Sequence, residues 1–390
     1  MGLAVVRGLR AGLGRLRQAM QIPTPFYYVD EALLVRNLEI LQKVSAEAEC
    51  KILLAQKAFS MFSMYPLIGK YLSGTTASGL YEARLGAEEM GGETHIFSPA
   101  YTQNEFDDIL TLCDVVVFNS FAQWDEFRAK ALASGRRYGI RINPECPTGK
   151  NPLYDPCVPG SRLGVTQDGF RSDLLEGISG LHFHTLCEQN ADDLLTTVGV
   201  VEKKFGKWLH QMDWLNIGGG HHITREDYDV DALIGCVKRL RDTYGVTVYI
   251  EPGEAVVLNA GFLTASVLEL VQNGMTTTIL DASAACHMPD VLEVPYTPAV
   301  IGAGKPGEYA YEYRLAGPTC LAGDIVGDYA FPEPLKRGDR LTFCDMAHYT
   351  MVKNNTFNGM SLPTIAIKRQ NGTFEVIKTF GYDDFKNRLS

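Results

Sequence analysis

The chain has 390 residues, of which 46% are hydrophobic and 21% are charged, a composition typical of a globular protein long enough for about two domains. Its formal net charge is −10, which makes it a poor candidate for binding nucleic acid and favours cationic small molecules. It has no run of 18 apolar residues and no C-x-x-C pair among its nine cysteines, so we expect no membrane span, zinc ribbon or disulfide framework, and a reducing, cytoplasmic location.

The first nineteen residues differ from the rest of the chain. They contain four arginines and no acidic residue. Their apolar stretches are too short for a signal peptide. We therefore interpret residues 1–19 as a leader that is not part of the fold.

From residue 30 onward, helix-like and strand-like segments alternate. Helices are predicted at residues 30–45, 105–113, 123–135, 191–209 and 230–245, and strands at residues 51–56, 74–78, 94–99, 114–120, 138–143, 179–185, 214–219 and 246–252. Strands that alternate with helices are typically parallel, and eight such units fit a TIM barrel. A doubly wound sheet is the rival, but no G-x-G-x-x-G motif follows the first strand. We predict a barrel over residues 20–255.

The pattern changes after about residue 255. Strand-like runs at residues 261–274, 275–283, 340–346 and 373–380 are separated by turn residues, and few helix patterns occur. The sequence therefore predicts a second, all-β domain over residues 256–390.

The predicted barrel strands all end in polar residues or glycine. In a TIM barrel, the functional side chains lie at these carboxyl ends. The residues are Lys57, Ser78, Ser98, Asn119, Asn143, His184, Gly218, Gly219, Gly220 and Glu251. Any one of them alone is explained by a strand end that meets solvent, but the set together indicates an active site.

Three of these strand ends suggest one cofactor. Lys57, in the run LLAQKAFS, has the features of a lysine that forms a Schiff base, because desolvation lowers the pKa of an amine and makes it nucleophilic. The glycine run 218–220 follows the seventh strand, where barrels often bind phosphate. Glu251 ends the eighth strand and could pair with a protonated ring nitrogen. Together they point to pyridoxal 5'-phosphate.

These motifs resemble those of the fold-type III pyridoxal-phosphate decarboxylases, the family of ornithine, arginine and diaminopimelate decarboxylases. AQKAFS, HFHTL, GGG and EPGE resemble its cofactor-binding motifs, GPTCLAGD resembles the loop with its proton-donating cysteine, and DMAHYTMVKNNTFNG resembles the segment with its phosphate-binding tyrosine. The resemblance runs in order through nearly all of the chain from Met20. It implies that Lys57 holds the cofactor, His184 stacks on its ring, Cys320 protonates the product and Tyr349 reaches the phosphate, within a homodimer that shares its active sites.

Two departures from the family pattern suggest a substrate. Glu254 stands where the ornithine and diaminopimelate enzymes typically have arginine, and the runs HTLCEQ and ASAACHMPD resemble the branch that acts on the carboxylated polyamines carboxynorspermidine and carboxyspermidine. Such a substrate presents ammonium groups, which carboxylates bind through charge-assisted hydrogen bonds. Glu254, Asp290 and Asp324 are the candidate substrate-binding residues.

Several alternatives stay open. The chain could decarboxylate diaminopimelate, ornithine or arginine, although Glu254 argues against the first. An alanine-racemase-like enzyme is disfavoured because such racemases place arginine, not a carboxylate such as Glu251, at the ring nitrogen. A non-catalytic relative that binds a regulatory partner is disfavoured because the cofactor lysine and the cysteine are both present. His182, His184, His221 and His222 do not show the spacing of a metal site, and we predict none.

Overall fold

The computed structural model describes residues 21–149 and 151–390, so the predicted leader lies outside the described residues. The chain divides into two compact units. One comprises Arg36–Val256, and the other combines Val257–Ser390 with the described residues before Arg36. No helix in the described ranges is long and apolar enough to cross a membrane.

The first unit is built on a closed barrel of eight parallel strands in sequential order. The strands are β2 (Lys51–Ala55), β3 (Gly74–Ala77), β4 (Glu93–Phe97), β5 (Val115–Phe118), β6 (Arg137–Arg141), β7 (Gly180–His182), β8 (Trp214–Asn216) and β9 (Thr247–Ile250). All eight coincide with predicted strands. The TIM barrel prediction is therefore confirmed.

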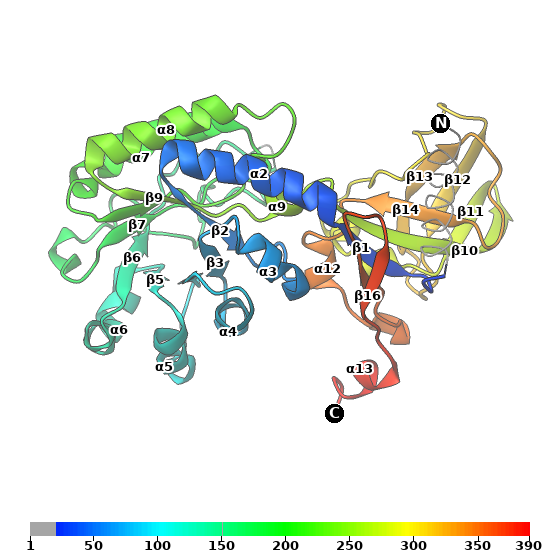
Figure 1. Cartoon of the computed structure of the whole chain (residues 1–390), viewed down its shortest axis with the longest axis horizontal. Helices are drawn as coiled ribbons and strands as arrows, with labels where there is room; N and C mark the ends of the chain where they lie inside the picture. The colour runs from blue at the N-terminus through cyan, green and yellow to red at the C-terminus, as the bar shows by residue number, and fades with distance from the viewer. Residues whose placement is uncertain (1–20, 150) are drawn as a thin grey trace, which may run out of the picture. The chain divides into compact units, whose positions relative to one another are not determined.

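Helices connect the strands around the outside of the barrel (Figure 1). They are α2 (Glu31–Ala48), α3 (Tyr65–Ile68), α4 (Leu80–Glu89), α5 (Gln103–Leu112), α6 (Phe121–Ser134), α7 (Ala191–Leu209), α8 (Val230–Tyr244) and α9 (Glu254–Val257). Helix α8 shows why the sequence pattern sets these bounds. The side chain of Asp229 accepts a hydrogen bond from the amide of Ala232 at its start, and Gly245 ends it in a left-handed conformation with φ 70°.

The barrel interior combines a tightly packed layer with a polar layer. The ring of Trp214 lies over Gly139 and Gly180, where an added Cβ would come within 2.3 and 2.0 Å of it. Glu93, at the amino end of β4, accepts hydrogen bonds from Arg137 (2.7 Å) and from the hydroxyl of Tyr249 (2.9 Å). These groups therefore fill the end of the barrel at which its strands begin.

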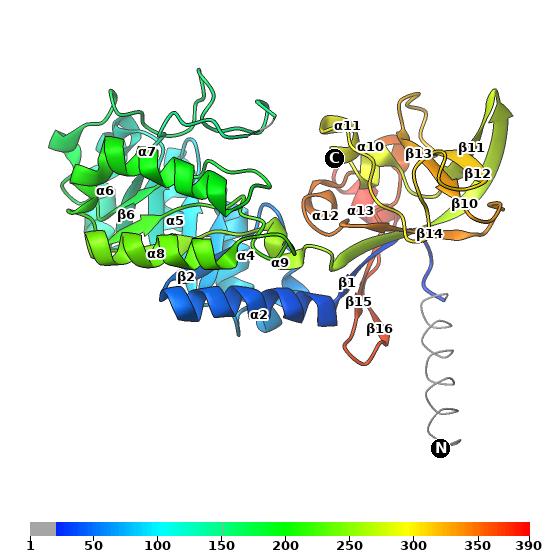
Figure 2. The ribbon, with the colours of Figure 1, turned by 90° about the horizontal axis from the view of Figure 1, so that it is seen from above.

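The second unit is mostly an antiparallel sheet with four short helices. Its strands are β1 (Phe26–Asp30), β10 (Gly261–Asn273), β11 (Met275–Leu280), β12 (Tyr311–Ala316), β13 (Ile325–Phe331), β14 (Arg340–Cys344), β15 (Thr364–Lys368) and β16 (Phe374–Lys378), and its helices are α10 (Ala284–His287), α11 (Asp290–Glu293), α12 (Thr350–Lys353) and α13 (Tyr382–Lys386). The long curved strand β10 is plain in Figure 2. The predicted β domain is thus present, with β12, β13 and β15 added to the predicted strands.

One segment belongs to a different unit from the one predicted. Residues 20–255 were assigned to the barrel, but β1 pairs antiparallel with β10 and parallel with β15. It is therefore a strand of the second sheet, and the barrel strands begin at Lys51. The reason is that the partners of β1 lie more than two hundred residues away, where no local pattern reports them.

Candidate active site

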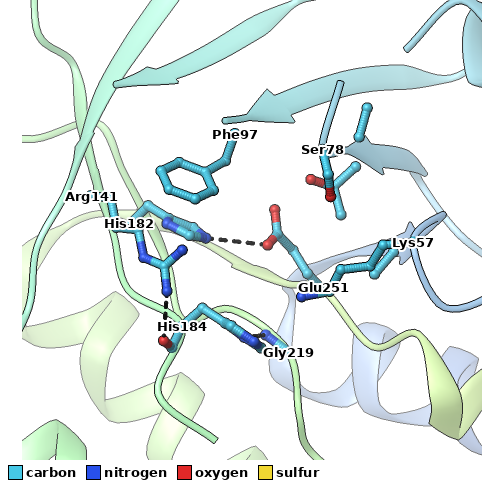
Figure 3. A pocket seen from close by; sticks show the side chains of 11 residues that line it. Lys57, Ser78, Phe97, Arg141, His182, His184, Gly219 and Glu251 are labelled. Atoms are coloured by element: carbon cyan, nitrogen blue, oxygen red, sulfur yellow. Dashed lines mark hydrogen bonds and ion pairs between the residues drawn. The ribbon is translucent and has the colours of Figure 1, made fainter. Parts of the chain in front are cut away.

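A pocket opens at the carboxyl ends of the barrel strands. Figure 3 shows side chains from several strands that converge on it. Its lining consists of Ala55, Lys57, Thr76, Ala77, Ser78, Phe97, Arg141, His182, His184, Gly219 and Glu251. Five of the predicted strand-end residues are among them: Lys57, Ser78, His184, Gly219 and Glu251. The fold thus brings together the lysine, the histidine and the carboxylate that the sequence pattern singled out.

Other predicted strand-end residues support loops instead. Asn119 donates a hydrogen bond to the carbonyl of Arg162 (2.9 Å) and accepts one from the amide of Gly164 (2.7 Å). Asn143 donates to the carbonyl of Leu163 (3.1 Å), in the same loop. These two asparagines therefore secure the loop between β6 and β7 and are not part of the pocket lining.

Lys57 lies two residues beyond β2, with its side chain accessible to solvent within the pocket. Although solvent reaches the side chain, the pocket walls around the amine partly desolvate it and lower the pKa of its ammonium group, and the positive charge of Arg141 lowers it further. The carboxylate of Glu251 acts in the opposite direction. A lowered pKa leaves a larger share of the amine unprotonated at neutral pH, which is the nucleophilic form.

Glu251 is held by donors at both of its oxygen atoms. Asn216 Nδ2 donates to Oε1 (2.8 Å), and His182 Nε2 lies 3.2 Å from Oε2, as drawn in Figure 3. Burial by itself would raise the pKa of this carboxyl, but the interactions with His182, His95 and Asn216 outweigh it and bring the pKa to about 2. Glu251 is therefore an anion at neutral pH.

His184 is fixed by the backbone of the glycine run. The amide of Gly219 donates to Nδ1 of His184 (2.9 Å), and Arg141 donates to the carbonyl oxygen of His184 (3.0 Å). Because Nδ1 accepts a hydrogen bond, the proton of the neutral ring is on Nε2. Burial, followed by the charges of Lys57 and Arg141, keeps the pKa of His184 well below its usual value. The ring is thus neutral and held in one orientation.

The glycine run 218–220 is required by close packing. Gly218 and Gly220 have φ values of 73° and 81°, and an added Cβ at Gly219 would lie 2.2 Å from the carbonyl oxygen of Glu251. The amide of Gly218 donates to Oδ1 of Asn216 (2.8 Å), and that of Gly219 is engaged by His184. Two of the three amides therefore hold the run to the barrel.

The sequence pattern did not predict four polar or aromatic residues of the site: Phe97, Arg141, His182 and Asn216. His182 was considered only as a metal ligand. Arg141 is 4% exposed, and its guanidinium carbon lies 4.5 Å from the centre of the Phe97 ring. Burial lowers its pKa to about 10, so it remains charged at neutral pH. The sequence signal that could have identified Arg141 is an arginine between two isoleucines in the predicted strand YGIRIN, because a buried arginine is rare unless it is paired.

Glu254, the candidate ammonium ligand, is the first residue of α9. Its Oε2 lies 3.2 Å from Nε2 of His222, close enough for an ion pair. The two atoms are not aligned for a hydrogen bond. Nε2 of His222 is buried. A histidine that stands two residues after the glycine run therefore faces the carboxylate that replaces the family's arginine.

The remaining predicted residues lie in the second unit. Cys320 is exposed, and its amide donates to Oδ1 of Asn358 (2.7 Å). Asp324 is 2% exposed and hydrogen-bonded within its own unit, whereas Asp290 forms an ion pair with Lys353. Tyr349 is half-buried and has a φ of 52°, a strained conformation for a residue other than glycine that is typical of functional positions.

Comparison with known proteins identifies the family. The family model described as "Pyridoxal-dependent decarboxylase, C-terminal sheet domain" matches residues 26–347. The chain belongs to the pyridoxal-dependent decarboxylases. The resemblance noted in the sequence motifs is therefore confirmed.

Two relatives and one solved structure that are similar to this pyridoxal-dependent decarboxylase carry more specific names. A carboxynorspermidine/carboxyspermidine decarboxylase from Campylobacter jejuni is 43% identical and covers 94% of this chain and 99% of its own. A carboxyaminopropylagmatine decarboxylase from Synechocystis is also 43% identical, with coverage of 94% and 96%. A crystal structure of carboxynorspermidine decarboxylase from C. jejuni, complexed with norspermidine, superimposes with a TM-score of 0.89 at 42% identity and covers 94% and 100% of the two chains.

Proposed function

We propose that this chain decarboxylates a carboxylated polyamine, carboxynorspermidine or carboxyspermidine, with pyridoxal 5'-phosphate as its cofactor. The observation that carries the proposal is the pocket in which Lys57, His184 and Glu251 converge. It is supported by the 43% identity, over nearly the full length of both chains, to a protein named for this activity.

The residues of the pocket fit the cofactor. Lys57 offers an amine of lowered pKa for the aldehyde group, and Glu251 offers an anion for the ring nitrogen. His184 offers a neutral, oriented ring for one face of the pyridine. Gly220 and the proposed contact Tyr349 would hold the phosphate.

Bound pyridoxal phosphate supplies an electron sink for the electron pair that remains on Cα when carbon dioxide leaves. Lys57 would hold the cofactor through its amine. Glu251 would keep the ring nitrogen protonated, which would strengthen the sink. Cys320 Sγ donates a proton to Cα, so that one proton is consumed for each carbon dioxide released. We place Cys320 in the site of the opposite subunit of a homodimer, in keeping with the family resemblance.

The polyamine part of the substrate is cationic, which suits a chain with a net charge of −10. Glu254 is the proposed ammonium ligand, because it provides a carboxylate close to the glycine run. A second candidate substrate is carboxyaminopropylagmatine, since the Synechocystis relative is equally similar to this chain. That molecule ends in a guanidinium group, and a carboxylate would bind either kind of cation.

Release of carbon dioxide from a panel of substrates tests this function. The panel comprises carboxynorspermidine, carboxyspermidine, carboxyaminopropylagmatine, diaminopimelate, ornithine and arginine. We expect the wild-type chain to prefer a carboxylated polyamine. Lys57→Ala should lose both the activity and the absorbance of the covalently held cofactor, whereas Lys207→Ala, outside the pocket lining, should keep both. Full activity in Lys57→Ala, or exclusive turnover of diaminopimelate or ornithine, would overturn the proposal.

A further inference from the structure

Two residues beside Glu251 have a role that the motifs do not assign. His182 ends β7 and Asn216 ends β8. Strand β8 pairs with β9, which leads into Glu251, and β7 is the next strand around the barrel. Each reaches a different oxygen of that carboxylate, at 3.2 and 2.8 Å respectively. The two residues are 1% and 0% exposed, respectively. Among the described hydrogen bonds, neither His182 nor Asn216 contacts Lys57. Both side chains contact Glu251.

The protonation state of His182 follows from its surroundings. A carboxylate only accepts hydrogen bonds, so Nε2 of His182 must be the atom that carries the proton. Its Nδ1 is buried and has no hydrogen-bond partner in the described part of the chain. A second proton there would create a buried, unpaired N–H group, which is costly. His182 therefore donates to Glu251 as a neutral ring and does not give its proton away.

The orientation of His182 is set by packing. Its ring stacks on that of Phe97, with centroids 5.6 Å apart and planes inclined by 25°. Figure 3 shows the imidazole between Phe97 and Glu251. The ring thus packs on Phe97 through one face, and its Nε2 is directed at Oε2 of Glu251.

The orientation of Asn216 is set by the glycine run. Its Oδ1 accepts the hydrogen bond of the Gly218 amide (2.8 Å), which only an oxygen can do. The NH2 group must then face Oε1 of Glu251. The same side chain thus links the turn proposed to bind phosphate to the carboxylate proposed to bind the ring nitrogen.

We propose that His182 and Asn216 are positioning residues that keep Glu251 ionised and aimed at the ring nitrogen of the cofactor. The inference rests on the proposed function, because it concerns the cofactor that the function requires. Two donated hydrogen bonds stabilise the carboxylate form over the carboxylic acid. They also occupy one lone pair on each oxygen and leave the others for the N–H group of the pyridinium.

Other charges around Glu251 could favour its ionised form without these donors. Lys57 and Arg141 are nearby cations, and His95 and His184 are titratable rings near the pocket. The test must therefore remove one donor and leave these groups unchanged. His182→Phe does so, because it keeps an aromatic ring against Phe97 while removing Nε2. His182→Gln restores a side-chain N–H donor.

The experiment uses full-length protein reconstituted with pyridoxal phosphate labelled with 15N in the ring, and it measures the ring nitrogen chemical shift. We expect a protonated nitrogen in the wild type at neutral pH. In His182→Phe the more basic carboxylate should draw the proton away, so the shift moves toward that of an unprotonated ring. His182→Gln should restore at least half of the difference. The exposed His210→Phe is the control and should match the wild type.

Measurements of turnover and of folding distinguish a failure of this inference from a failure of the proposed function. We expect kcat to fall about ten- to a hundredfold in His182→Phe with KM changed less than threefold, the pattern of a weakened electron sink. If His182→Phe does not fold, Asn216→Ala removes the second donor and must shift the 15N signal in the same direction. A bound label with a wild-type shift in the folded variant overturns this inference alone. A wild-type chain that takes up no label overturns the proposed function and this inference with it.

Discussion

The hydroxyl of Thr319 donates a 2.6 Å hydrogen bond to the carboxylate of Asp324, and Thr319 is the residue immediately before Cys320. The other oxygen of Asp324 accepts hydrogen bonds from the hydroxyl of Ser283 (3.0 Å) and the amide of Ala285 (3.2 Å). Asp324 was a candidate substrate ligand, but its oxygens are occupied by its own unit. We propose instead that it holds the loop that carries Cys320.

Asp324→Asn tests this positioning role. The variant keeps the size of the side chain but loses the charge, and hydrogen bonds to a charged group contribute roughly 1.5–3 kcal/mol. We expect a lower Tm and a kcat reduced about tenfold, with KM nearly unchanged. Asp328→Asn, which alters an exposed ion pair with Arg314, serves as the control. A large rise in KM with kcat preserved would return Asp324 to the role of substrate ligand.

Glu254→Gln tests the proposed ammonium ligand. The variant keeps hydrogen bonding but removes the charge, so kcat/KM for the carboxylated polyamine should fall about ten- to a hundredfold, as expected for a hydrogen bond to a charged group. Cofactor absorbance should not change, because Glu251 and the glycine run hold the ring and phosphate. Glu254→Arg should be worse, since it places a like charge against the ammonium.

Because Glu254 contacts His222, the same variant also distinguishes two other roles of Glu254 from substrate binding. If Glu254 serves only to contact His222, Glu254→Gln leaves kcat/KM within about twofold, the size of effect typical of minor charge changes. If the pair instead binds the phosphate, the variant weakens cofactor binding in equilibrium dialysis. The exposed Glu226→Gln, in the same loop as His222, controls for a general change of charge.

Mixed dimers test whether the active site is shared. Lys57→Ala and Cys320→Ala chains should each be nearly inactive alone. If Cys320 acts in the partner's barrel, mixing equal amounts should restore about a quarter of the wild-type activity, because about half of the dimers are mixed and each has one intact site. Native mass spectrometry establishes that mixed dimers form. Absence of activity in a preparation shown to contain them would count against a shared site.

His287 should make stability depend on pH. Its Nδ1 accepts a hydrogen bond from the amide of Ser283 (3.1 Å), and Nε2 lies 3.1 Å from the carbonyl of Ser361. Burial lowers its pKa to about 4. Because the folded pKa is below the unfolded value of about 6.5, the stabilisation is fully present above pH 6.5 and is lost as the pH falls toward 4.

The expected loss between pH 8 and pH 5 is roughly 2 kcal/mol from His287 alone. Thermal unfolding at the two pH values measures it. His287→Gln should be less stable at pH 8 but should lose less stability on acidification than the wild type. The exposed His210→Gln should behave as the wild type does. An identical pH dependence in His287→Gln and the wild type would show that His287 does not contribute.

The sequence predicts the barrel and part of its pocket because both follow from local patterns. Lys57, His184 and Glu251 could be found because they lie one or two residues after the end of a barrel strand, where a barrel presents its functional side chains. Arg141 and His182 were missed because they are the last residues within their strands, where the alternation of inward and outward positions depends on register. The loop-holding role of Asp324 was missed because Ser283 and Ala285, its partners, lie about forty residues away.

Strand β1 lies between β10 and β15 in its sheet, although Asp30 and its ion-pair partner Lys368 are 338 positions apart in the chain. During synthesis the barrel residues leave the ribosome long before residues 364–368 do, and domains generally fold as units in the order in which they are made. The nascent chain must therefore carry β1 with one edge unpaired until residues 364–368 have been made. A chain that ends before residue 364 would leave the second sheet without the strand that β1 pairs with in parallel.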